Sequence, residues 1–337
     1  MSQTEETIDF IISWVDGNDA KWCTEKNKYE KERIGDDREE RYRDWNMLKF
    51  WFRGVEKYAP WVRRIHFVTC GQVPKWLNSN HPKIHVVRHE DYIPSQYLPT
   101  FNSHTIELNF HRIPGLAKHF VYFNDDMFLI KKVKPNDFFV NGLPRDMLAL
   151  QPVVVKPDNT MMAHIFLNNT IVISKYFNKR ENVKNQPLQY FKIGYPIKYF
   201  IYNMLELFFP LFSGFYTVHG ASPLCKETYY ELWEKEENVL DQACKHKFRS
   251  KEDVNQYLLR EWQKLKGNFC AKNITKDFCY FEVDNENAKL IDTIKKQKVK
   301  VICINDTNSK IDFETVKTEL QRAFEIILPE KSFYEHN

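Results

Sequence analysis

The sequence predicts an α/β protein in which helices flank a Rossmann-like, mostly parallel sheet and a mainly helical subdomain is inserted into this core. Short apolar segments alternate with stretches whose apolar residues recur at helical spacing, a pattern typical of strand–helix–strand units. Polar residues directly follow the apolar segments, and parallel α/β sheets bind ligands at the carboxyl ends of their strands. We therefore divide the chain into an N-terminal core part (1–140), a less regular, variable insertion (141–215) and a C-terminal core part (216–337).

Five apolar segments are expected to be buried strands, because each is short and rich in β-branched or aromatic residues. They span residues 8–13, 64–69, 83–88, 119–123 and 300–304. Helices are predicted from Asp44 to just before Pro60 and again after Asp312. A further helix is expected to begin at Ser250, with Asp253 completing an approximate capping box.

Composition narrows the class of protein. A chain of 337 residues with 43% hydrophobic content can bury one large core or two small ones. Its net charge of +4, without a long run of one sign, suits anionic substrates and argues against nucleic-acid binding. Seven cysteines without a CxxC pair favour a reducing cytoplasm over a disulfide scaffold, and the opening MSQTEETIDF lacks the pattern of a secretory signal.

Residues 193–216 form the most apolar stretch of the chain. Lys198, Glu206 and two prolines interrupt it, which makes it a poor transmembrane helix. We expect a buried helix or a lid here. The alternative is a patch that contacts the inner face of the cell membrane or a lipid-linked acceptor.

Two adjacent acids follow the strand at 119–123. Unpaired carboxylates beside apolar residues are costly, and a divalent cation that also holds a phosphate would remove that cost. Asp125 and Asp126 are therefore candidate ligands of Mg²⁺ or Mn²⁺. Asn305 and Asp306 end another strand in the same way, although an Asx turn would explain them equally well. Asp16, before a glycine, has the same two interpretations.

Three further positions are candidates for phosphate and proton chemistry. Ser103 and Glu107 lie one turn apart on a helix predicted from Asn102. Arg249 precedes the expected helix start, where a guanidinium beside free N–H groups would suit a phosphate; a surface arginine is the plainer alternative. His219 is predicted to lie in a loop. It could act as a general base, although most loop histidines have no catalytic role. The sequence has no Walker loop, GxGxxG or GxSxG motif.

In this order, the motifs resemble those of the Stealth family. The first two conserved regions of the family are similar to IDFIISWVDGND at 8–19 and to residues 41–78 and 98–129, which include FNDDMFL. The third is similar to residues 219–233, HGASPLCKETYYELW, with 247–258 following, and the fourth to VICINDT at 301–307. The resemblance thus covers most of the chain, and residues 140–215 match least.

Stealth proteins include bacterial capsular polysaccharide phosphotransferases and the animal enzyme that adds N-acetylglucosamine-1-phosphate to lysosomal glycoproteins. The resemblance implies transfer of a hexose-1-phosphate from a nucleotide diphosphate sugar to the hydroxyl of a glycan or lipid-linked glycan, with release of UMP. It also implies a divalent metal, Mg²⁺ or Mn²⁺. The metal ligands implied are Asp125, Asp126, Asn305 and Asp306; the catalytic residues are Asp126, His219 and Arg249; and the substrate-binding residues are Asp16, Ser103, Glu107 and Arg249.

The chain departs from the family pattern at two places. Cys70 stands where many members have Asp or Asn, and Asp44 is the only match to a more acidic segment of the animal members. Without the extra modules and membrane anchor of the animal enzyme, a cytoplasmic bacterial enzyme of capsule or exopolysaccharide synthesis is the better fit. Two other functions remain open: a metal-dependent glycosyltransferase that releases UDP, and a surface-glycan binding protein without catalysis.

Overall fold

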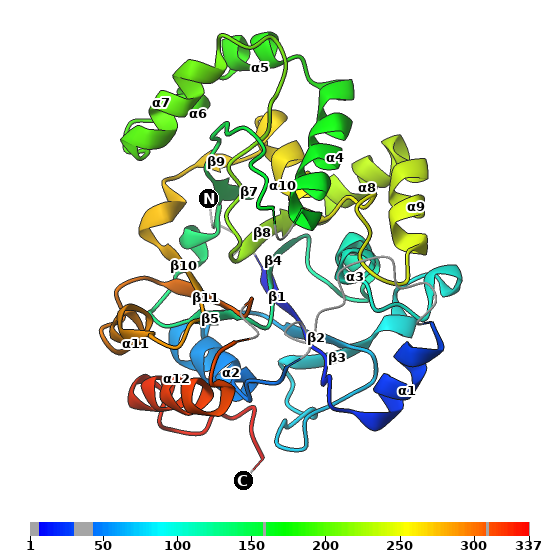
Figure 1. The fold of residues 1–337 in the computed structure, drawn as a ribbon, viewed down its shortest axis with the longest axis vertical. Coiled ribbons are helices and arrows are strands. Elements are labelled where there is room, and N and C mark those ends of the chain that lie inside the picture. Colours follow the sequence, from blue (N-terminus) through cyan, green and yellow to red (C-terminus); the bar gives the residue numbers. More distant parts are fainter. Residues whose placement is uncertain (1–6, 30–42, 158–159, 308–309, 337) are drawn as a thin grey trace, which may run out of the picture.

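The computed structural model describes residues 7–29, 43–157, 160–307 and 310–336. At its centre is a five-stranded sheet in the order β3-β2-β1-β4-β8 (Figure 1). Strands β1 to β4 run parallel, and β8 runs antiparallel to β4. These strands are β1 (Ile8–Ser13), β2 (Ile65–Thr69), β3 (Ile84–Arg88), β4 (His119–Phe123) and β8 (Ser222–Cys225). The predicted α/β class, a mostly parallel sheet flanked by helices, is therefore confirmed.

The main sheet is buried on both faces. Phe10 and Ile12 of β1 pack in a core that includes α2 (Leu48–Tyr58) and α12 (Phe313–Ile327). Ile11 packs on the other face, in a core that includes α10 (Gln256–Leu265). Because successive side chains of a strand point to opposite faces, an uninterrupted apolar strand needs a helical layer on each side. Figure 1 shows α2 and α12 on one side of the sheet and α10 on the other.

The strand near residue 300 is not in the main sheet, contrary to expectation. β11 (Val301–Asn305) lies in a second sheet, in the order β10-β11-β5, with β10 (Phe278–Glu282) and β5 (Met127–Leu129). β5 follows β4 after the turn at 124–126 and pairs antiparallel with β11. The chain thus crosses directly from one sheet to the other at the acidic pair. A third sheet contains β6 (Phe139–Val140), β7 (Leu143–Asp146) and β9 (Cys270–Ala271).

The helix starts predicted at Asn102 and Asp312 are correct, whereas α2 begins at Leu48 and not at the predicted Asp44. The Asp312 carboxylate accepts a hydrogen bond from the Thr315 amide and begins α12 as predicted. The predicted start at Ser250 is wrong, because α10 begins at Gln256 after an Asn255 cap. The reason is that the Asp253 carboxylate is engaged by side chains from elsewhere in the fold and caps no helix. The remaining helices of the core are α1 (Ala20–Lys28), α3 (Ser103–Leu108), α8 (Lys226–Lys235), α9 (Glu237–Lys245) and α11 (Ala288–Lys295).

The region after residue 160 is helical and lies at the end of the molecule opposite α12 (Figure 1). It contains α4 (Met161–Tyr176), α5 (Lys179–Asn185), α6 (Pro187–Tyr190) and α7 (Ile197–Glu206). The expectation of a buried helix at 193–216 is wrong, because Ile193, Phe208 and Leu211 are 98%, 84% and 70% exposed. In the part of the chain that the structure describes, no helix combines the length and apolarity required to cross a bilayer.

Candidate functional site

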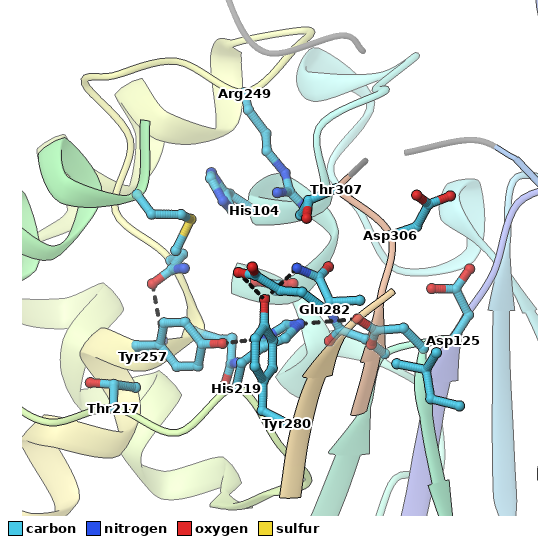
Figure 2. Close-up of a pocket in the computed structure, with 18 of the residues that line it drawn as sticks. His104, Asp125, Thr217, His219, Arg249, Tyr257, Tyr280, Glu282, Asp306 and Thr307 are labelled. Atoms are coloured by element: carbon cyan, nitrogen blue, oxygen red, sulfur yellow. Dashed lines mark hydrogen bonds and ion pairs between the residues drawn. The ribbon is translucent and has the colours of Figure 1, made fainter. Parts of the chain in front are cut away.

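A cavity of about 600 Å³ opens where the main sheet meets the second sheet. The ends of β1, β4 and β11 form its floor, and α3, α4, α10 and the loop before α10 form its walls (Figure 2). Of the nine predicted site residues, seven line it: Glu107, Asp125, Asp126, His219, Arg249, Asn305 and Asp306. A polar cavity of this size can enclose a nucleotide sugar.

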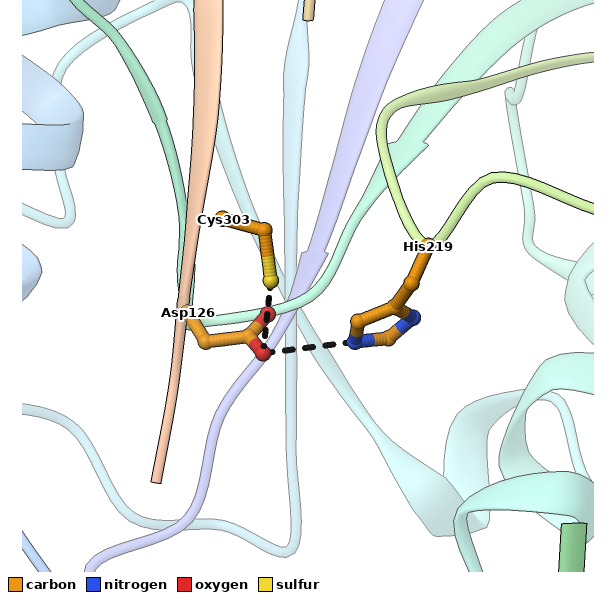
Figure 3. A group of neighbouring side chains, drawn as sticks. All are labelled: Asp126, His219 and Cys303. Atoms are coloured by element: carbon orange, nitrogen blue, oxygen red, sulfur yellow. Dashed lines mark hydrogen bonds and ion pairs between the residues drawn. The ribbon is translucent and has the colours of Figure 1, made fainter. Parts of the chain in front are cut away.

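The turn between β4 and β5 places Asp126 at the junction of the two sheets. The Asp126 carbonyl accepts a hydrogen bond of 2.8 Å from the Ile304 amide of β11. Its carboxylate Oδ2 lies 3.2 Å from the Cys303 Sγ and 3.3 Å from His219 Nε2 (Figure 3). Burial and the Asp126 charge raise the pKa of the Cys303 thiol, so this thiol stays protonated and donates to the carboxylate.

Two oxygen atoms of this turn are buried without a hydrogen-bond partner among the described residues. They are Oδ1 of Asp126 and Oδ1 of Asn124. A buried acceptor that lacks a partner costs about 1–3 kcal/mol, and more when it is charged. A hard divalent cation takes oxygen ligands of this kind, so the donor set fits Mg²⁺ or Mn²⁺.

Asp125 is exposed to the solvent of the cavity yet surrounded by protein on its other sides. This environment, together with the neighbouring Asp126, raises the pKa of the Asp125 carboxyl to about 7. Asp44 adds to the negative potential, and Arg249 opposes it. A bound cation would bring the carboxyl back to its ionised form at neutral pH.

We expect Asp125→Asn to stabilise the metal-free protein at alkaline pH. Folding raises the pKa of this carboxyl, so its ionisation destabilises the native state. The destabilisation begins once the pH exceeds the pKa of the unfolded state, and it reaches its full size above the pKa of the folded state. The melting temperature of Asp125→Asn should therefore exceed that of wild type by about 2–4 °C near pH 8, with the gap closing near pH 4. Thermal unfolding in EDTA measures this, and an equal gap at both pH values would contradict it.

Arg249 reaches into the cavity from the loop before α10 and is held by α3. Its Nε donates a hydrogen bond of 3.0 Å to the Ser103 hydroxyl. Ser103 itself does not line the cavity, whereas Glu107, one turn later, does. Burial raises the pKa of the Glu107 carboxyl, although His104 and Arg249 nearby counteract this. Figure 2 shows Arg249 and His104 on the same side of the cavity.

A buried carboxylate fixes the loop that carries Arg249. Asp253 accepts hydrogen bonds from the Asn102 side chain, the Ser250 amide and two histidine rings, His104 at 2.8 Å and His246 at 2.6 Å. These donors lower the pKa of the Asp253 carboxyl to about 2, so it remains charged at any physiological pH. The network joins the start of α3 to the loop at 246–253 and so sets the position of Arg249.

His219 lies between Tyr257 and Asp126. Its Nδ1 is 2.6 Å from the Tyr257 hydroxyl, and its Nε2 faces the Asp126 carboxylate. The Tyr257 hydroxyl can donate to Nδ1 or accept from it, and the tautomer of the ring decides which of the two occurs. A group bound at this wall of the cavity would lie within reach of both Asp126 and His219, and either side chain could accept a proton from it.

Three other predicted residues already have hydrogen-bond partners in the protein. The Asp306 carboxylate bonds to Arg43 at 2.8 Å and to the Trp45 indole at 3.2 Å. The Asn305 amide donates to the Tyr280 hydroxyl. Asp16 lies outside the cavity wall, and its carboxylate accepts from the Asn18 amide, as the Asx-turn interpretation expects.

The structure adds residues that the sequence did not single out. They line the cavity or hold its walls: Arg43, Trp45, His104, Asn124, Tyr257, Tyr280 and Cys303. A histidine next to Ser103 carries no signal of its own, because its partner Asp253 is 149 positions away. Cys303 lies within an apolar strand, and such a strand explains a cysteine without a site.

The fold places an acidic cavity at the ends of its strands, and known proteins share the sequence that forms it. Residues 41–146 match Stealth protein CR2, conserved region 2. The chain is 43% identical to the capsular polysaccharide phosphotransferase WcwK of Streptococcus pneumoniae, across 98% of both proteins. It is 39% identical to the receptor polysaccharide phosphotransferase WefC of Streptococcus gordonii, across 98% of this chain and 99% of that one.

These relatives show that the chain belongs to the Stealth family, and it is a phosphotransferase enzyme. Among solved structures, the galactosyltransferase LgtC in complex with donor and acceptor sugar analogs aligns with 94% of this chain and 95% of its own. The TM-score is 0.41 and the sequence identity 11%.

Proposed function

We propose that the protein transfers a hexose-1-phosphate, such as N-acetylglucosamine-1-phosphate, from a nucleotide diphosphate sugar to a glycan hydroxyl. The product is a phosphodiester in a capsular or other cell-surface polysaccharide, and UMP is released. The observation that carries this proposal is the turn at 124–126, which lies in one cavity with Arg249. It holds the pair Asp125–Asp126 and, among the described residues, two buried oxygens without partners, Oδ1 of Asn124 and Oδ1 of Asp126. Relatives named capsular, receptor and exopolysaccharide phosphotransferases support the substrate class.

Asp125 and Asp126, with Asn124, are the residues that would hold Mg²⁺ or Mn²⁺. The bound metal would neutralise the two phosphates of the donor. In the reaction, the acceptor oxygen forms a bond to the β-phosphorus while the bond from this phosphorus to the bridging oxygen breaks, and UMP leaves. Arg249 compensates the negative charge on the transferred group. The hydroxyl proton passes to Asp126 or His219, which lie on the same wall.

We assign the remaining predicted residues to supporting roles. Glu107 binds the donor within the cavity, and Ser103 acts by holding Arg249. Asn305 would reach a metal only if it released Tyr280, and Asp306 only if it released Arg43. Asp16 shapes the turn behind Trp14, which lines the cavity. In the insertion 141–215, Val154, Lys156 and α4 face the cavity, which supports a role for this region in accepting the glycan.

Product analysis tests the proposal. Purified protein is incubated with a panel of nucleotide sugars that begins with UDP-N-acetylglucosamine, with Mg²⁺ and candidate glycan acceptors. UMP release with a new phosphodiester signal in phosphorus NMR, absent in EDTA, is the expected result. UDP release with a new glycosidic bond would instead establish a glycosyltransferase.

The cysteine beside Asp126 provides a test of the metal type. Asp126, His219 and Cys303 lie close enough to hold one ion, and a thiolate in that set would favour zinc. Because the Cys303 thiol is protonated, we expect Cys303→Ala to keep activation by Mg²⁺ or Mn²⁺ and to change kcat by less than about tenfold. Loss of metal activation in this variant, or selective activation by Zn²⁺, would contradict an oxygen-ligand site.

All seven cysteines are free of disulfide bonds, which supports a reducing, cytoplasmic location for the reaction.

A further inference from the structure

Helix α7 presents its apolar side to solvent. The exposed residues recur at helical spacing along one stripe: Ile197, Phe200, Ile201, Met204 and Leu205. The stripe continues past the end of the helix into Leu207, Phe208, Phe209 and Leu211, and Ile193 precedes it. Single exposed apolar residues are ordinary, but a contiguous patch of this kind marks an interaction surface.

The inner side of α7 shows that this orientation is built into the sequence. Asn203 is buried and bonds to the Leu150 amide and to the carbonyls of Leu148 and Tyr190. If the helix turned to bury its apolar stripe, it would expose Asn203 and leave these backbone groups without partners. The patch therefore faces outward because polar groups hold the opposite side.

The loop after α7 is held in the same way. Lys179 and Glu206 form a buried ion pair of 2.7 Å, and the Lys179 ammonium also donates to the Leu211 carbonyl. The Ser213 hydroxyl donates to the Glu206 carboxylate. Phe208 and Phe209 lie between these anchored positions, so their rings project from a fixed loop rather than from a loose one.

Charge identifies the partner. The exposed charged residues between 180 and 211 are Arg180, Lys184, Lys192 and Lys198 against one acid, Glu181. Basic side chains around an outward apolar stripe suit the headgroups and acyl boundary of an anionic lipid surface. A second copy of the chain would bring the same basic residues face to face, which disfavours a symmetric dimer through this patch.

The patch is linked to the cavity through the backbone. The segment that follows it pairs with another segment of the insertion, since the Gln151 and Val153 amides donate to the carbonyls of Gly214 and Ser213. Beyond this pairing, Val154 on one segment and Thr217 on the other line the cavity. The segment that carries the patch is thus joined by backbone hydrogen bonds to a segment that lines the cavity.

We propose that α7 and residues 207–211 dock the enzyme onto an anionic membrane surface, where it meets a lipid-linked acceptor. The part concerning the acceptor rests on the proposed function, whereas membrane docking does not. Flotation of the whole protein with vesicles tests docking without any donor, acceptor or turnover. Vesicles of phosphatidylcholine alone are compared with vesicles that also contain phosphatidylglycerol.

We expect wild type to float with the anionic vesicles. The double variant Phe208→Ser/Phe209→Ser should bind at least about tenfold more weakly, because two apolar rings no longer enter the boundary. The double variant Lys192→Gln/Lys198→Gln should lose only the preference for anionic vesicles. Phe333→Ser, which removes a phenyl ring that is 78% exposed and lies outside the patch, is the control and should bind as wild type does.

Two results would overturn docking. One is wild type that floats with neither kind of vesicle. The other is a dimer in light scattering that Phe208→Ser/Phe209→Ser dissociates, which would show that a second copy covers the patch. With a water-soluble acceptor, Phe208→Ser/Phe209→Ser should turn over as wild type does. Equal turnover on a lipid-linked acceptor in vesicles would refute the acceptor part alone.

Discussion

Asp126→Asn is expected to lower kcat by at least about 10³-fold, since the substitution removes the charge at the centre of the site and keeps its shape. The amide oxygen still accepts from Cys303 and His219, so the fold should be retained. Initial rates of UMP release at saturating donor and acceptor measure the effect.

The matched control is Glu314→Gln, a carboxylate-to-amide change on the exposed side of α12. Its kcat should equal that of wild type, and the melting temperatures of both variants should lie close to that of the parent. The interpretation fails if Asp126→Asn keeps its activity while the metal requirement persists, because Asp126 would then be neither ligand nor base. Excess Mn²⁺ should not rescue the variant.

Arg249→Ala is expected to lower kcat by about 10²–10³-fold, because the guanidinium lies where charge develops on the transferred phosphoryl group. Arg249→Lys should recover only part of this loss, since an ammonium cannot bond Ser103 and the phosphoryl group as a planar fork does. In both variants, kcat should fall by a larger factor than KM rises.

Ser103 allows the role of Arg249 to be separated from direct donor binding. Ser103→Ala alone should lower kcat by about tenfold or less, because it frees the arginine that the hydroxyl holds. In the Arg249→Ala background, the same substitution should have no further effect. An additive loss in the double variant would show instead that Ser103 contacts the donor itself.

The acidic pair could be singled out from the sequence because its signal is local. Asp125 and Asp126 follow a buried strand directly, and no packing argument places two carboxylates there. By contrast, the partner of the strand at 301–305 depends on which of several apolar strands is within reach, and a local pattern does not encode that choice. The strand therefore entered the second sheet, not the main one.

Two other misses have the same origin. Ser250 and Asp253 have the spacing of a helix cap, but Asp253 bonds to His104 and Asn102 from a distant segment. In α7, apolar spacing is identical whether the stripe faces the core or the solvent. The orientation of α7 is decided by Asn203 and Glu206, which are buried on its opposite side. Their hydrogen-bond partners come from other segments, and the sequence alone does not reveal them.

The pairing of β5 with β11 makes the candidate site a late product of folding. Asp126 and Cys303, which bond across this pairing, are 177 positions apart. Closing so long a loop costs conformational entropy before any contact compensates for it, and contacts of high sequence separation form slowly. During synthesis, the four parallel strands β1 to β4 of the main sheet are complete at residue 123, before β8 and the second sheet are available. The contact between Asp126 and Cys303 therefore forms only after β11 has been synthesised.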